Sequence, residues 1–185
     1  MDPRQRSVYL TFDDGPLPET TPYILDTLAR YSVKATFFMV GDNAARNPHL
    51  LAAVRQQGHR TGNHTYNHVS GHRHPAASYL ANTDQAEDIL QTDKLFRPPH
   101  GWMTPSQYHT LLRSSYKIIM WDLLTRDYTK TLTPAEILEN VRRYTRPGSI
   151  VTFHDSLRSA DKLHTALPQS IQWLLDQGYE FKTFD

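Results

Sequence analysis

Strand-like and helix-like segments alternate along the whole of this 185-residue chain. Runs of bulky or β-branched residues predict seven strands, at Val8–Phe12, Ala35–Val40, His59–Gly62, Leu95–Arg97, Lys117–Trp121, Ser149–Phe153 and Tyr179–Phe184. Apolar residues three and four apart predict helices between them, at Thr21–Tyr31, Pro48–Gln57, Ala76–Asp93, Pro105–Ser114, Pro134–Tyr144 and Ala166–Gln177. This alternation is typical of an α/β fold with a mainly parallel sheet.

Two arrangements of such a sheet are possible, an open doubly wound sheet and a barrel. Doubly wound sheets usually carry a glycine-rich phosphate loop after the first strand, and neither the dinucleotide-binding pattern nor the P-loop pattern occurs here. In a barrel, the chemistry lies where the strands end and the following loops begin. The side chains at the predicted strand ends therefore test the barrel interpretation.

Composition narrows the function classes. The length and the ordinary hydrophobic content of 38% predict one domain over residues 1–185. A net charge of +1 without a basic stripe argues against nucleic acid, and no apolar run approaches the roughly 20 residues of a membrane span. The absence of cysteine excludes disulfides, thiolate ligands and a cysteine nucleophile. The sequence leaves two properties open: the oligomeric state, and the choice between a secreted, periplasmic or cell-envelope location after signal removal and a cytoplasmic one.

Ionisable and metal-capable side chains follow nearly all of the predicted strands. They are Asp13, Asp14, Asp42, His64, His68, Arg97, His100, Asp122, Asp127, His154 and Asp155. The carboxyl ends of parallel strands meet at one rim, so we expect these groups to converge there.

Two histidines and a pair of aspartates indicate a metal site. His64 and His68 become ring neighbours if their segment makes one helical turn, and two imidazoles with a carboxylate and an open position are typical of hydrolytic zinc. Of Asp13 and Asp14, one can bind the metal and the other can accept a proton, provided that the strand has ended before Gly15. The alternatives are a polar loop for the histidines and a simple turn for the aspartates.

The motifs "TFDDGP", "HTYNH", "FRPPHG", "WDLLTRDY" and "IVTFHD" occur in the order and strand-end positions of the five motifs of polysaccharide deacetylases. The chain thus resembles the NodB-homology domain of carbohydrate esterase family 4 from Tyr9 to its last strand. The resemblance implies a distorted TIM-like barrel of seven or eight strands. It also implies a divalent metal, most often zinc, with cobalt, nickel or manganese as other candidates, and an acetylated polysaccharide or oligosaccharide as the partner.

The resemblance also implies roles for individual residues. Asp13 matches the catalytic base, Arg97 the arginine that holds the base or its neighbours, and His154 the general acid. Asp127 matches the aspartate that interacts with the acid–base machinery and would keep His154 protonated. The matching metal ligands are Asp14, His64 and His68. The alternatives are an ion pair between Asp127 and Arg97 and a core position for His154.

The sequence departs from the family pattern at four positions, which are His100, Leu124, Tyr128 and Thr152 in place of Tyr, Asp, Trp and Leu. We expect these changes to affect the groove walls, the acetyl pocket and substrate choice. Trp102, Trp121 and Tyr128 are candidates for stacking on sugar rings, with a core position as the alternative for Trp121. His72 and His74 could bind a second metal, but a solvated loop is the favoured interpretation of this pair.

These observations predict a hydrolase that removes N-acetyl groups from an N-acetylglucosamine-containing glycan of the chitin or peptidoglycan type. The alternatives are an O-acetyl esterase acting on xylan or a related glycan, and a carbohydrate-binding relic of the fold without turnover.

Overall fold

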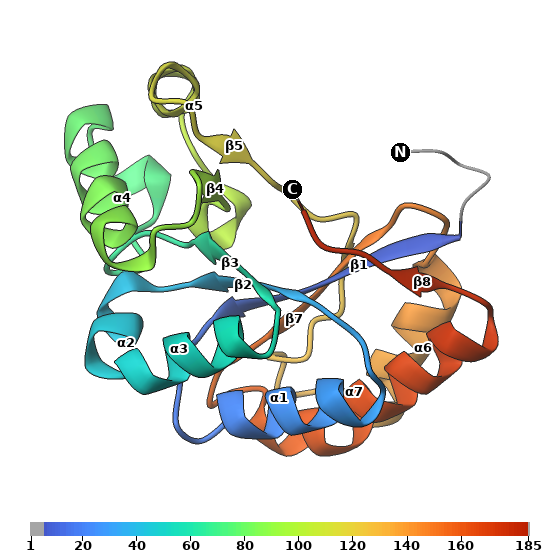
Figure 1. Cartoon of the computed structure of the whole chain (residues 1–185). Coiled ribbons are helices and arrows are strands. Elements are labelled where there is room, and N and C mark those ends of the chain that lie inside the picture. Colours follow the sequence, from blue (N-terminus) through green and yellow to red (C-terminus); the bar gives the residue numbers. More distant parts are fainter. Residues whose placement is uncertain (1–5, 185) are drawn as a thin grey trace.

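The computed structural model describes residues 6–184, so the ends of the predicted domain, residues 1–5 and 185, lie outside the described residues. Parallel strands form the centre of the molecule (Figure 1). In chain order they are β1 Ser7–Asp14, β2 Thr36–Met39, β3 Arg60–Asn63, β4 Leu95–Phe96, β5 Lys117–Ile118, β6 Leu123–Leu124, β7 Ile150–His154 and β8 Glu180–Phe181. Their spatial order is β5-β4-β3-β2-β1-β7-β6, and β8 pairs with the other end of β1.

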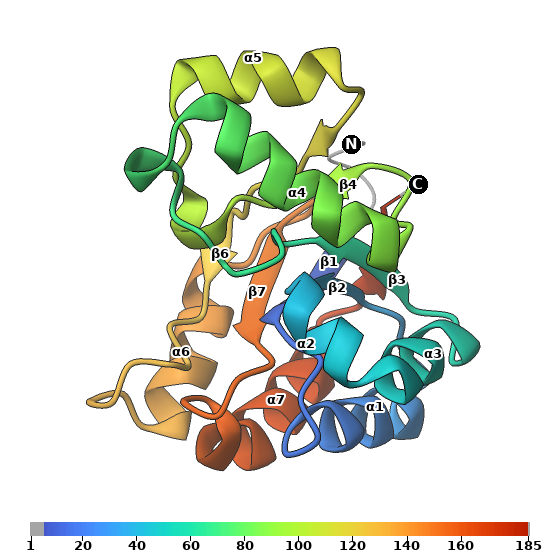
Figure 2. The same cartoon turned by 90° about the vertical axis from the view of Figure 1, so that its left-hand side faces the viewer.

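Seven α-helices within the described residues form an outer layer around the curled sheet (Figures 1 and 2). They are α1 Thr21–Arg30, α2 Gly41–Arg46, α3 Pro48–Gln56, α4 Ala76–Leu90, α5 Pro105–Arg113, α6 Pro134–Tyr144 and α7 Ala160–Asp176. All strand pairs in the described residues are parallel, and β5 and β6, the two ends of the strand order, do not pair there. The prediction of an α/β fold with a distorted, barrel-like parallel sheet is confirmed. The sheet curls into a half-barrel.

The alternation of β1 decides what faces the helices and what faces the inside of the curl. Val8, Leu10 and Phe12 are buried in the main core, which also holds the apolar faces of α1, α6 and α7. Thr11 and Asp13 point the other way, since both contact the same arginine, Arg97, inside the curl. A buried strand therefore delivers a carboxylate to the interior of the half-barrel because its side chains alternate.

A smaller core under α4 and α5 supports the far side of the sheet. Tyr79, Phe96, Leu111 and Tyr116 pack there, with Phe96 edge-on to both tyrosines. This cluster fixes β4, and with it the residue that follows the strand, Arg97.

The structure differs from the prediction in several elements. The predicted strand over residues 117–121 ends at Ile118 as β5, and β6 and α2 were not among the predicted elements. Helix α7 begins six residues earlier than predicted, at Ala160, with Pro168 inside it. Pro168 has no N–H for the His164 carbonyl one turn earlier, and the Tyr23 hydroxyl donates to that carbonyl instead, at 3.1 Å. Helix α6 begins with a capping box formed by Thr133 and Glu136.

Candidate active site

The carboxyl ends of five neighbouring strands, from β4 to β7 in the spatial order, bring the predicted site residues together. In the pairing of β1 with β7, Asp13 lies opposite His154. Asp14 lies opposite Met39 of β2, whose carbonyl accepts the N–H of His64 at 2.9 Å. On the other side of β3, the Arg97 N–H donates to the Asn63 carbonyl. The register of the sheet thus places acids and histidines from distant parts of the sequence at one rim.

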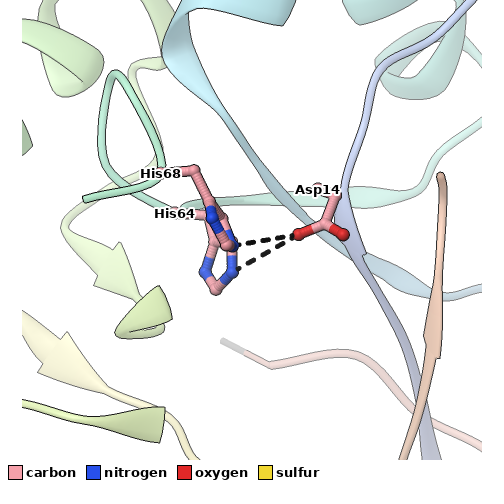
Figure 3. A group of neighbouring side chains, drawn as sticks. All are labelled: Asp14, His64 and His68. Carbon is pink, nitrogen blue, oxygen red and sulfur yellow. Dashed lines mark ion pairs between the residues drawn. The ribbon is translucent and has the colours of Figure 1, made fainter. Parts of the chain in front are cut away.

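Asp14, His64 and His68 form a compact group of metal-ligand donors (Figure 3). The Asp14 Oδ1 atom lies 3.8 Å from Nε2 of His64 and 3.3 Å from Nε2 of His68. One donor atom from each residue lies within 4.8 Å of the other two. Donors bound at 2.0–2.1 Å to a tetrahedral ion are about 3.4 Å apart, so the spacing fits a small divalent cation.

The segment carrying the two histidines is not the helical turn that the sequence suggested. Thr65 and His68 have φ values of 64° and 53°, in the left-handed region. The imidazoles are nevertheless neighbours, with ring centroids 5.1 Å apart. The expected ring proximity is confirmed, whereas the expected backbone is wrong.

The surroundings of His64 prepare it as a ligand. Its Nδ1–H donates to the main-chain carbonyl of Arg97 at 2.7 Å, which leaves the lone pair on Nε2, the atom facing Asp14. Burial lowers the pKa of His64 to about 4, although the charges of Asp13 and Asp14 act in the opposite direction. His64 is therefore a neutral imidazole near neutral pH, the form that binds metal.

Asp14 reaches the site because β1 stops alternating at its last residue. Its φ of 84° is one that Asp tolerates better than most residues. Burial raises the pKa of Asp14, but the hydrogen bond with His68 and the nearby histidine charges outweigh burial and bring it to about 2. With an ionised carboxylate and two imidazoles, the donor set fits zinc or a similar divalent ion.

Asp13 is held by a buried ion pair. Its side chain is almost fully buried, and its Oδ1 atom accepts from Nη1 of Arg97 at 2.6 Å. The same guanidinium donates to the hydroxyls of Thr11 and Thr152 and to the carbonyls of Ile119 and Met120. Arg97 thus fixes the Asp13 carboxylate beside the metal-ligand donors. The alternative of an ion pair between Arg97 and Asp127 is wrong.

Asp127 instead pairs with His154. Its Oδ1 atom lies 2.8 Å from Nδ1 of His154, and its Oδ2 atom accepts the His154 main-chain N–H at 2.8 Å. Burial alone would lower the pKa of His154, but the hydrogen bond and charge of Asp127, with the charges of Asp13 and Asp14, raise it to about 9. His154 is therefore protonated near neutral pH, and with Nδ1 engaged its free proton is on Nε2.

All these groups except Arg97 and Asp127 line one open cavity of about 800 Å³. Apolar side chains complete its walls, namely Leu17, Val40, Trp121, Leu124, Tyr128 and Leu157. The Tyr128 ring stands edge-on to the His154 ring at 4.6 Å. The cavity thus combines metal-ligand donors, a carboxylate and an imidazolium between apolar walls, a combination suited to hydrolysis with general acid and base groups.

The polysaccharide deacetylase family model matches residues 1–117. The chain is 34% identical to a peptidoglycan-N-acetylglucosamine deacetylase from Bacillus cereus, over 97% of this chain and 86% of that protein. It is 31% identical to a chitooligosaccharide deacetylase from Sinorhizobium fredii, over 94% and 87%. The chain belongs to the polysaccharide deacetylase family. The crystal structure of the Bc1960 peptidoglycan N-acetylglucosamine deacetylase superimposes with a TM-score of 0.90 at 33% identity, over 98% of this chain and 87% of that one.

In this member of the polysaccharide deacetylase family, the predicted substrate-binding residues do not all reach the cavity. His100, Trp121 and Tyr128 line it, as does Leu124, another of the departures from the family motifs. Trp102 is 61% exposed, stands edge-on to His72 and lies outside the lining. Thr152 is fully buried, and its hydroxyl contacts Thr11 and Arg97, so the expectation that it forms part of a substrate-binding wall is wrong.

Asp122 was expected at the catalytic rim and lies at the opposite end of the sheet. Its main-chain N–H donates to Ile150, the first residue of β7, and its carboxylate binds Arg146 and Ser149, which precede that strand. His72 and His74 do not belong to any metal-ligand group within the described residues.

Asp155 was expected at the rim without a specific role, and the structure shows that it supports the segment that carries Asp13. Its buried carboxylate accepts hydrogen bonds from Thr20 and Thr21 at 2.5 and 2.6 Å, and its N–H donates to the Asp13 carbonyl. Burial raises the pKa of Asp155 to about 7, against the effect of the two hydroxyls. The available signal was its position directly after His154 in "FHDS". Asp155 thus connects the end of β1 with the start of α1.

Proposed function

We propose that this chain is a metal-dependent hydrolase that removes the N-acetyl group from N-acetylglucosamine in a glycan of the peptidoglycan or chitin type. We propose zinc as its ion, Asp13 as its base and His154 as its acid. The observation that carries the proposal is the arrangement of the Asp14–His64–His68 donors, an arginine-held carboxylate and a protonated histidine around one cavity.

Asp14, His64 and His68 would hold the ion, which when bound would activate a water molecule and polarise the acetyl carbonyl. Asp13 accepts the proton of that water as the water attacks the acetyl carbon. The ion pair with Arg97 keeps the Asp13 side chain in one orientation, so little reorganisation is needed when the substrate arrives. The main-chain N–H of His100 is the proposed donor to the carbonyl oxygen as that oxygen gains charge.

His154 completes the reaction by protonating the departing amine. An amine is a poor leaving group without this proton, so the acid must be charged before the C–N bond breaks. Asp127 meets this requirement, because its carboxylate both orients the ring through Nδ1 and raises the pKa to about 9. The Nε2 proton then goes to the nitrogen of the glucosamine.

The choice of an N-acetylated glycan is supported by the activities of the similar deacetylases and by the cavity walls. Trp121, Tyr128 and Leu124 offer apolar surface on which the CH-rich faces of sugars pack. The walls leave the cavity open, which suits a position within an extended glycan strand.

The experiment is an acetate-release assay with chitooligosaccharides, peptidoglycan and acetylxylan, run as purified, with chelator, and with zinc, cobalt, nickel or manganese added back. We expect release from the N-acetylated glycans, loss with chelator and best recovery with zinc, together with stoichiometric zinc in elemental analysis. Release from acetylxylan alone would replace the proposal with an O-acetyl esterase. Glycan binding without acetate release under any condition would replace it with a binding relic.

A further inference from the structure

The two walls of the catalytic cavity carry different charge. In the strand order, β2 and β3 lie on one side of β1, and β7 and β6 lie on the other. The first wall presents Asp42, Asn43 and Asn67, and Asp42 already pairs with Arg46 at 2.5 Å. The second wall comes from the segments after β6 and β7 and presents Tyr128, Ser156, Leu157 and Arg158 to the cavity. These segments also contain Arg126, Lys130 and Lys162, which lie outside the lining, so Arg158 is the cation that this wall presents.

The two segments of this second wall are held together by hydrogen bonds from a lysine. The Lys162 ammonium donates to the main-chain carbonyls of Asp127, at 3.1 Å, and Thr129. The acids nearby do not neutralise the wall toward the cavity. Asp127 is paired with His154, Asp155 is buried under two threonine hydroxyls, and Asp161 is exposed outside the cavity lining.

Arg158 is the member of this wall that lines the cavity itself, together with Ser156 and Leu157. Its side chain is exposed and has no ion pair, hydrogen bond or ring contact with any other residue in the described range. Arg97, by contrast, is fully buried and its guanidinium is already occupied. Arg158 therefore presents an unpaired guanidinium to the same cavity as the proposed acid, His154, at the edge of the space that a glycan would occupy.

We infer that Arg158 binds a carboxylate on the glycan next to the sugar being deacetylated, so that this chain prefers anionic glycan strands to neutral chitooligosaccharides. The inference rests on the proposed function. A guanidinium presents two parallel N–H donors that match the two oxygens of a carboxylate. Leu157, which is 64% exposed beside it, can pack against an apolar group attached to that carboxylate.

In a glycan of the peptidoglycan type, such a carboxylate has two sources. One is the lactyl ether of N-acetylmuramic acid in strands without peptide, and the other is the peptide attached to that lactyl group. The shared chemistry is a carboxylate one sugar away from the acetyl group that is removed.

The test compares kcat/KM for acetate release from three substrates: neutral chitooligosaccharides, peptide-free strands of alternating N-acetylglucosamine and N-acetylmuramic acid, and the same strands with peptide. The quantity measured is the ratio of each anionic substrate to the neutral one. Arg158→Gln is expected to lower this ratio about three- to tenfold, the range for an ion pair that is partly open to solvent. Arg158→Lys keeps the charge but not the two parallel N–H donors, so its ratio is expected to lie between those of the parent protein and Arg158→Gln.

Arg113→Gln is the matched control, because Arg113 is an exposed arginine on α5 outside the cavity lining, and its ratio should match that of the parent protein. Added salt should lower the ratio of the parent more than that of Arg158→Gln. Thermal melts check that each variant is folded.

A ratio in Arg158→Gln within twofold of the parent value would overturn the inference while leaving the proposed function intact. If the parent released no acetate from any of the three substrates, the proposed function itself would fail. A fall in the ratio for peptide-free strands identifies the lactyl carboxylate, and a fall confined to peptide-bearing strands identifies the peptide.

Discussion

The pairing of His154 with Asp127 gives a prediction whose size follows from the structure. Asp127 contacts His154 twice, at the ring Nδ1 and at the main-chain N–H, each at 2.8 Å. Asp127→Asn keeps the shape of the side chain and an oxygen for the main-chain N–H but removes the negative charge. Without that charge, burial is the largest remaining influence, so we expect the pKa of His154 to fall from about 9 to about 6.5 or below.

The expected loss of activity follows from the protonated fraction. At pH 7.5, a histidine with a pKa of about 9 is about 97% protonated, whereas one with a pKa of about 6.5 is about 10% protonated. Turnover at pH 7.5 should therefore fall about tenfold, and the alkaline limb of the pH–rate profile should move down by about two pH units or more.

The same substitution should change how stability depends on pH. The pKa of His154 is raised in the folded state above its unfolded value of 6.5, so its contribution is fully present below pH 6.5 and is lost as the pH rises through about 9. A shift of this size corresponds to about 3 kcal/mol. Asp127→Asn should remove this loss, so its free energy of unfolding should change less between pH 6 and pH 10 than that of the parent.

The decisive measurement is an NMR titration of the His154 ring in both proteins, supported by urea unfolding at several pH values and by the rate profiles. Asp161→Asn serves as the control, because Asp161 is an exposed acid on α7 that does not contact His154. The reasoning is refuted if the His154 ring titrates near pH 6.5 in the parent, or still near pH 9 in a folded Asp127→Asn protein.

Three further predictions concern the other parts of the site. Asp13→Asn should still bind metal but lose turnover by at least about 10²-fold. Because the substitution leaves Arg97 unpaired, it should also lower the free energy of unfolding by about 3–5 kcal/mol, and turnover near the parent rate in the folded variant would remove Asp13 from its proposed role as base. The double substitution of His64 and His68 by Ala should abolish stoichiometric metal in elemental analysis, and full occupancy would rule out this ligand set. Gly15→Ala should lower stability by about 1–3 kcal/mol in urea unfolding, because its Cβ would lie 1.9 Å from Asp155 Oδ2; an unchanged unfolding midpoint would mean that this carboxylate can move aside.

The convergence of the site was predictable because one rule, that parallel strands end at a common rim, acts on residues visible in the sequence. It failed for Asp122, because the predicted strand over residues 117–121 ends at Ile118, and Asp122 directly precedes a separate strand, β6. Strands of two residues, such as β5 and β6, are too short for a period-2 pattern, so their bounds could not be read from periodicity.

The start of α7 was obscured for a different reason. Pro168 reads as a residue near a helix start, and only the tertiary contact from Tyr23 to the His164 carbonyl meets the hydrogen-bonding need that a proline inside a helix creates. Likewise, hydrogen bonds from neighbouring side chains, and not helical propensity, set the backbone of the segment that carries His64 and His68. The Thr65 N–H, for instance, donates to the Asn63 side chain.

The most consequential unpredicted feature is that Arg97 acts on the site through both its main chain and its side chain. Its carbonyl accepts the Nδ1 proton of His64 and so directs Nε2 toward Asp14, while its guanidinium holds Asp13. The proposed metal ligand and the proposed base are therefore oriented by one residue at the end of β4.

The same guanidinium also contacts the chain that follows β5 and the Phe38 ring. It donates to the carbonyls of Ile119 and Met120, the two residues that follow β5, and its face lies over the Phe38 ring at 4.1 Å. Those two carbonyls are therefore hydrogen-bonded to an arginine, while the Ile119 N–H still donates to the Phe96 carbonyl of β4 at 2.8 Å. One buried cation thus divides its donors between the Asp13 carboxylate and the chain that follows β5, so the orientation of the proposed base and the path of that segment depend on the same side chain.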